Sequence, residues 1–83
     1  MARLEDIADG LAKRALDLVE LNSDESIERR VADEIGALSP TLQEAYATAI
    51  RIRKAELRAL RLLDKYDAGE EIPKAAISSQ PQD

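Results

Sequence analysis

The chain has 83 residues, a formal net charge of −5, and neither cysteine nor histidine. These totals exclude disulfides, thiol chemistry and imidazole-based catalysis, and they leave only oxygen ligands for a cation. At this length we expect one domain with a thin core, and its Ala- and Leu-rich composition with 35% charged residues is typical of helical proteins.

The first predicted helix covers about residues 2–21. Its apolar residues fall on one side of a helix with 3.6 residues per turn, and they are Leu4, Ile7, Ala8, Leu11, Ala12, Ala15, Leu18 and Val19. The pattern breaks at "LNSDES", where we expect Asn22 or Ser23 to cap the next helix.

The second predicted helix covers about residues 24–37. Its apolar stripe is narrow, and pairs of opposite charge four residues apart line the rest of its surface. This pattern is typical of an amphipathic helix that packs shallowly, and we expect Gly36 to end it.

The third predicted helix covers residues 40–67 and is the longest. Ser39 is expected to cap it, Pro40 suits its first position, and Gly69 suits the position just past its end. The sequence therefore predicts an all-α domain over residues 1–69, a three-helix bundle or helical hairpin with a long third helix. A flexible, disordered tail is expected over residues 70–83.

Two apolar stripes run side by side on this third helix. One contains Leu42, Ala45, Ala49, Ile52, Glu56, Ala59, Leu63 and Tyr66, and the other contains Tyr46, Ile50, Arg53, Leu57, Leu60 and Asp64. A helix with two adjacent stripes can contact two neighbours, within its own chain or in a second copy.

The relative lengths of the helices suggest where an interface lies. At 1.5 Å per residue the third helix is about 42 Å long, against about 30 Å and about 21 Å for the other two. Short loops favour antiparallel neighbours, which would leave the last turns of the third helix under-covered. We therefore expect Leu57, Leu60 and Leu63 to form a partner or dimer interface, with a homodimer as the simplest assembly.

Five basic residues share the other face of this helix: Arg51, Lys54, Arg58, Arg61 and Lys65. One interpretation is an ordinary solvated face. A second is a charge-steering strip for an acidic protein surface, such as the first two helices, which belong to a segment (residues 1–40) with ten acidic and five basic residues. A third is nucleic-acid binding, which the net charge and the lack of aromatic residues beside the strip disfavour.

Arg53 and Glu56 interrupt the apolar stripes. They are expected either to form an inter-chain ion pair that fixes the register of a dimer or to lie at the rim of the stripe with their charged ends in water.

No phosphate-loop motif occurs, and no apolar run reaches the length of a membrane span. The start "MARLEDIADG" has no apolar signal-peptide core, so we expect a cytoplasmic protein that does not contact membranes. We expect no enzyme activity, cofactor or metal. The sequence instead favours a small helical interaction module that regulates, adapts or inhibits a partner protein. The alternatives are a nucleic-acid-binding regulator and a structural component of a phage or other assembly.

Overall fold

The computed structural model describes residues 2–69. Helix α1 spans Leu4–Asn22, α2 spans Ser26–Gly36 and α3 spans Pro40–Asp67. The all-α class and the order of three helices are confirmed, and no strand occurs within residues 2–69. The predicted tail, residues 70–83, lies outside the described part of the chain.

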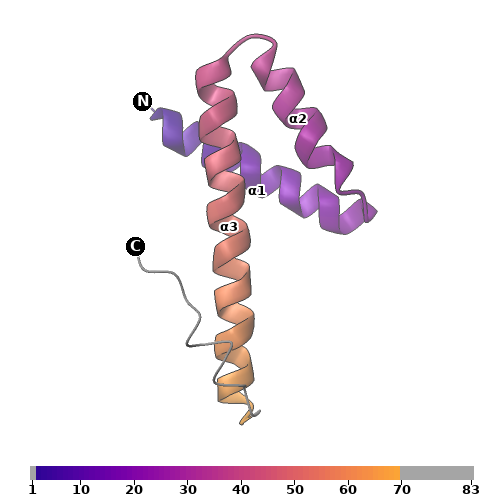
Figure 1. The fold of residues 1–83 in the computed structure, drawn as a ribbon, viewed down its shortest axis with the longest axis vertical. Helices are drawn as coiled ribbons and strands as arrows, with labels where there is room; N and C mark the ends of the chain where they lie inside the picture. Colours follow the sequence, from indigo (N-terminus) through magenta and orange to yellow (C-terminus); the bar gives the residue numbers. More distant parts are fainter. Residues whose placement is uncertain (1, 70–83) are drawn as a thin grey trace.

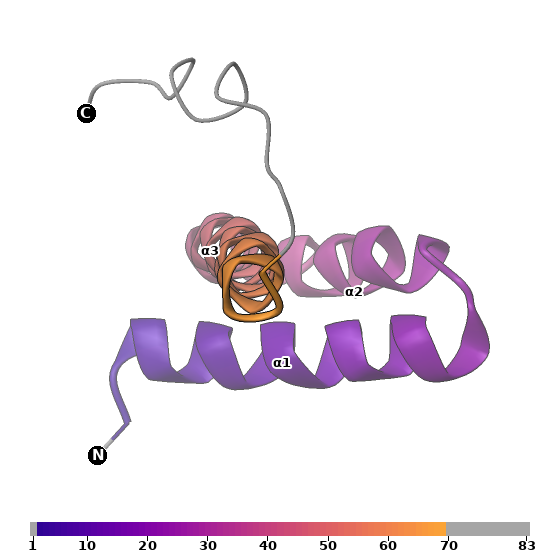
Figure 2. The ribbon, with the colours of Figure 1, turned by 90° about the horizontal axis from the view of Figure 1, so that it is seen from below.

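The helices do not form three parallel rods. α2 and α3 make a V-shaped hairpin, and α1 lies across α3 instead of alongside it (Figure 1). Viewed along α3, α1 forms one layer, and α2 and α3 form the second (Figure 2). The expectation of antiparallel neighbours thus fits α2 and α3 only loosely and does not describe α1.

Small residues explain why α1 can cross α3. Ala8, Ala12 and Ala15 are buried where α1 meets Tyr46 and its buried neighbours on α3, which are Ala49 and Ile50. Alanines one turn apart let two helix axes approach closely at a crossing. A crossing buries only the middle of a helix, so larger residues towards the ends of α1 remain partly exposed: Leu4, Ile7 and Leu18.

The junction between α1 and α2 differs from the prediction. Asn22 is still helical, and its side chain donates a hydrogen bond to the carbonyl oxygen of Leu18 at 2.9 Å. Ser23 adopts the left-handed conformation that ends α1. The Asp24 carboxylate then accepts hydrogen bonds from the Ser26 backbone at 3.0 Å and its hydroxyl at 2.6 Å. The side chain of Asp24, instead of that of Asn22 or Ser23, therefore binds the first residue of α2, and these bonds lower the pKa of the Asp24 carboxyl group.

Two side-chain hydrogen bonds tie α2 to α3. The Tyr46 hydroxyl donates to the carbonyl oxygen of Glu28 at 3.0 Å, and the Gln43 amide donates to that of Ala32 at 2.9 Å. Gly36 ends α2 as predicted, and a methyl group there would overlap the Gln43 amide. The lack of a side chain at Gly36 therefore leaves space for the hydrogen bond from Gln43 to Ala32.

Both ends of α3 agree with the prediction. The Ser39 hydroxyl accepts a hydrogen bond from the Leu42 backbone at 3.1 Å, and Pro40 is the first helical residue. At the other end Gly69 has a φ of +75°, a conformation that glycine adopts without steric cost.

Candidate protein-interaction surface

The second half of α3 projects beyond the other two helices (Figure 1). Between residues 51 and 69 every side chain is exposed except those of Arg53 and Leu62, which are half-buried. The first half of the same helix contributes Tyr46 and Ile50 to the core. The crossing of α1 therefore marks the boundary between a packed half and a projecting half of α3.

The three predicted interface leucines lie on the projecting half. Leu57, Leu60 and Leu63 are 45%, 48% and 57% exposed. Leu57 borders a groove of about 500 Å³, which also contains Leu16 and Val19 of α1, and the other two leucines lie farther along the helix. Their predicted exposure is confirmed, and their contact with a partner stays a prediction.

Arg53 is held within its own chain. Its guanidinium makes two hydrogen bonds to the Asp9 carboxylate of α1, at 2.6 and 2.7 Å. These bonds lower the pKa of the Asp9 carboxyl group and raise the pKa of Arg53. Arg53 thus has a carboxylate partner within its own chain, and an inter-chain pair with Glu56 stays a prediction. Glu56 is exposed.

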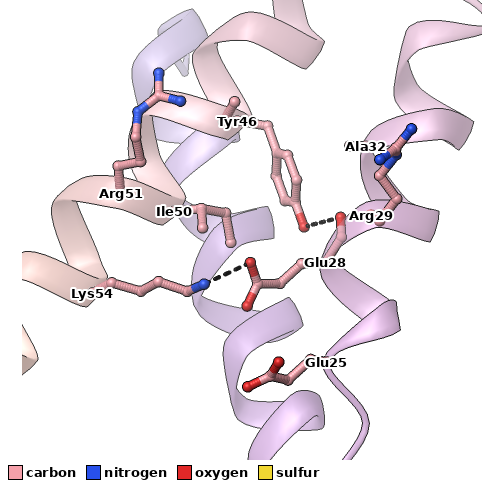
Figure 3. Close-up of a pocket in the computed structure, with 9 residues that line it drawn as sticks. Glu25, Glu28, Arg29, Ala32, Tyr46, Ile50, Arg51 and Lys54 are labelled. Carbon is pink, nitrogen blue, oxygen red and sulfur yellow. Dashed lines mark hydrogen bonds and ion pairs between the residues drawn. The ribbon is translucent and has the colours of Figure 1, made fainter.

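Lys54 is also engaged by its own chain. Its amine lies 2.9 Å from the Glu28 carboxylate, at the groove between α2 and α3 (Figure 3). The nearby Arg51 side chain points away from Glu28 in the same view. One member of the predicted charge-steering face, Lys54, is thus paired with an acidic residue of α2 in its own chain.

Four cations of the predicted charge-steering face make no ion pair within residues 2–69: Arg51, Arg58, Arg61 and Lys65. Arg58 and Arg61 line one side of the groove at Leu57, opposite Asp17, Glu20 and Glu25. An apolar floor between walls of opposite charge suits a protein surface that carries both signs of charge.

The described residues hold little that suggests chemistry. Tyr46 is the only titratable residue in the core, and burial raises the pKa of its hydroxyl, which donates to a backbone carbonyl. Residues 2–69 contain no group of three or more acidic side chains placed to bind a metal ion. None of the three described helices is long and apolar enough to cross a membrane.

A further exposed surface was not recognised from the sequence. We call it the uncharged face of α3, and it consists of the half-buried Leu62 and five exposed residues, Thr48, Ile52, Ala55, Ala59 and Tyr66. Ile52 is 63% and Tyr66 is 48% exposed. The predicted stripes grouped these two residues with Ala49, which the structure buries. The sequence does contain a signal that distinguishes Ile52 and Tyr66 from Ala49. The uncharged positions of this face are alternately four and three residues apart, and Ala49 does not belong to that series.

No protein-family model matches the chain, and no curated protein or solved structure is significantly similar to it.

Proposed function

We propose that the protein is a non-enzymatic, cytoplasmic interaction module that regulates, adapts or inhibits a partner protein. The observation that supports this proposal is the projecting half of α3 (Figure 1), on which large apolar side chains remain about half exposed. An exposed apolar strip of this kind is typical of a protein–protein contact. Leu57, Leu60 and Leu63 supply that contact in the proposal.

The neighbouring cations would attract an acidic partner electrostatically to the proposed contact. Arg58 and Arg61 stand beside Leu57 on the groove, and Arg51 and Lys65 extend the same basic face. Exposed charges at the rim of an interface mainly raise the rate of association and select partners of opposite charge. The homodimer belongs to this proposal, since a symmetric pair is the commonest way to cover such a strip.

Leu60→Asp tests the proposal, and Leu38→Asp is its matched control. Leu38 is 92% exposed in the turn before α3, so both substitutions place an acid at an exposed leucine. We expect Leu60→Asp to weaken partner binding or self-association at least tenfold while the thermal midpoint stays unchanged. The assays are sedimentation of the purified chain and co-purification from the native host.

The proposal fails if Leu60→Asp and Leu38→Asp behave alike in both assays. A co-purified protein that is lost with Leu60→Asp but kept with Leu38→Asp would identify the partner.

Nucleic-acid binding is the second candidate, because four cations that make no ion pair within residues 2–69 follow one face of α3. It predicts an affinity for duplex DNA or RNA that falls steeply with salt, and a shallower salt dependence for Arg58→Ala. Titration of labelled duplexes from low to physiological salt tests it. Undetectable or salt-independent binding would remove this candidate.

A further inference from the structure

The uncharged face of α3 has the spacing of a coiled-coil seam. With Ile52, Ala59 and Tyr66 at the first position of a heptad (a), Thr48, Ala55 and Leu62 occupy the fourth (d). The seam extends about 27 Å along the helix, from residue 48 to residue 66. It contains no charged residue, and its alanines would let a second helix approach closely.

This seam lies away from the packed face of α3. Tyr46, Ile50 and Arg53, which contact α1 and α2, fall at heptad positions b and f, on the other side of the helix from a and d, whereas the buried Ala49 falls at position e, at one edge of the seam. Of the described helices, α1 borders only the start of the seam, where Glu5 and Asp9 share a groove with Thr48 and Ile52. Ile52 and Tyr66 nevertheless remain 63% and 48% exposed, so the seam is left largely uncovered within residues 2–69. Figure 2 shows α1 and α2 on two sides of α3.

The two edges of the seam carry different charges. One edge (heptad position g) holds Arg51, Arg58 and Lys65, all of them exposed cations. The opposite edge (position e) holds Ala49, Glu56 and Leu63, so Glu56 is its one charged residue between residues 48 and 66. Glu5 of α1 lies on this side in a groove with Thr48 and Ile52, and we call this side the acidic edge.

We propose that the uncharged face binds the same face of a second copy, with the two α3 helices parallel and in register. A two-fold axis along the helices places the basic edge of each copy against the acidic edge of the other. Arg51 then faces the second copy's Glu56, five residues farther along, which is the usual spacing of a pair between g and e positions. An antiparallel pair would instead place basic edge against basic edge.

This inference rests on the proposed function and makes its homodimer specific. Leu57 and Leu60 occupy positions f and b, so they point away from the seam and stay available for a different protein, whereas Leu63 occupies position e at the edge of the seam. The predicted dimer contact thereby moves from Leu57 and Leu60 to Ile52, Ala59 and Tyr66. Arg53 remains committed to Asp9 within each copy.

Disulfide trapping tests this arrangement, because the natural chain has no cysteine. Like-numbered residues at a and d positions face one another only in a parallel, in-register pair. We expect Thr48→Cys and Ala59→Cys each to form disulfide-linked dimers under mild oxidation, at least tenfold faster than Leu57→Cys or Leu60→Cys. An antiparallel pair could link at most one of the two seam positions.

Charge reversal supplies the second measurement. Arg51→Glu and Glu56→Arg should each weaken the dimer several-fold in sedimentation equilibrium, and a mixture of the two variants should form the heterodimer in preference. Arg61→Glu, a cation on the same helix but off the seam, should leave dimerisation unchanged.

The outcomes separate this inference from the proposed function. Faster linking of Leu60→Cys than of Ala59→Cys would overturn the seam but keep a dimer through the leucines. If the chain stays monomeric at several hundred micromolar, the seam does not bind a second copy. The proposed function would still be supported if a partner protein is lost with Leu60→Asp. Seam cross-links combined with unchanged partner binding by Leu60→Asp would support the seam and remove the leucine contact.

Discussion

The two halves of α3 contain the same kinds of residue in different surroundings. Tyr46 in the first half is 2% exposed, and Tyr66 in the second half is 48% exposed. Both halves are regular helix. Helix formation therefore does not distinguish them. The difference arises because the core that α1 and α2 form with α3 takes its α3 residues from the first half, whereas their contacts with the second half lie near its start, at Arg53, Lys54 and the groove beside Leu57. A helix that extends past the helices packed against it leaves apolar surface that another chain can contact.

Removing the two tyrosines in turn is the strongest test of this difference. Tyr46→Ala should destabilise the fold by about 3–5 kcal/mol, because it empties the largest buried site and breaks the hydrogen bond to Glu28. Tyr66→Ala should cost less than about 1 kcal/mol in the monomer, since its side chain is already half in water. Urea unfolding followed by circular dichroism measures both.

Repeating the unfolding measurements at several protein concentrations tests the difference between Tyr46 and Tyr66 further. The cost of Tyr46→Ala should be independent of concentration, whereas any cost of Tyr66→Ala should grow with it if Tyr66 lies in a dimer seam. Equal losses for the two variants at every concentration would contradict the division of α3 into a packed and a projecting half.

The two ends of α3 provide a smaller test. Ser39→Ala removes the cap at the packed end and should cost about 1 kcal/mol of global stability. Gly69→Ala places a side chain at positive φ, but the last turn can fray without disturbing the core. We expect its global cost to be close to zero in the same unfolding assay. A larger cost for Gly69→Ala than for Ser39→Ala would mean that the projecting end is held as firmly as the packed one.

The smallest expected effect concerns pH and the Asp9–Arg53 pair at the boundary between the halves. Hydrogen bonds from Arg53 lower the pKa of folded Asp9, so the pair stabilises the fold fully above the unfolded pKa of about 4. That contribution is lost as the pH falls through the lower pKa of the folded state. Thermal melts of the natural chain and Arg53→Gln should therefore differ at pH 7 and converge towards pH 2.5.

Asp64→Asn on the projecting half is the control for this measurement, since Asp64 makes no ion pair within residues 2–69. We expect it to leave the thermal midpoint unchanged. A difference between the natural chain and Arg53→Gln that persists unchanged at pH 2.5 would show that Arg53 acts through packing and not through the Asp9 carboxylate.

Local chemistry allowed the sequence to predict much of the fold. The bounds of α3 followed from Ser39, Pro40 and Gly69, since capping depends on residues within a few positions of the helix end. The junction near Asp24 was missed because several polar residues compete there for the same backbone groups. The exposed leucines of α3 were anticipated from helix lengths alone.

The sequence by itself determined three helices, their approximate bounds and a third helix longer than its neighbours, because these properties depend on local spacing and capping. The tertiary structure decided that α1 crosses α3, that Asp9 binds Arg53, and which apolar stripe lies in the core. Asp9 and Arg53 are 44 residues apart in the chain, and no local pattern relates them. Periodicity identifies the apolar sides of a helix, but only the crossing geometry selects the side that is buried and the side left exposed.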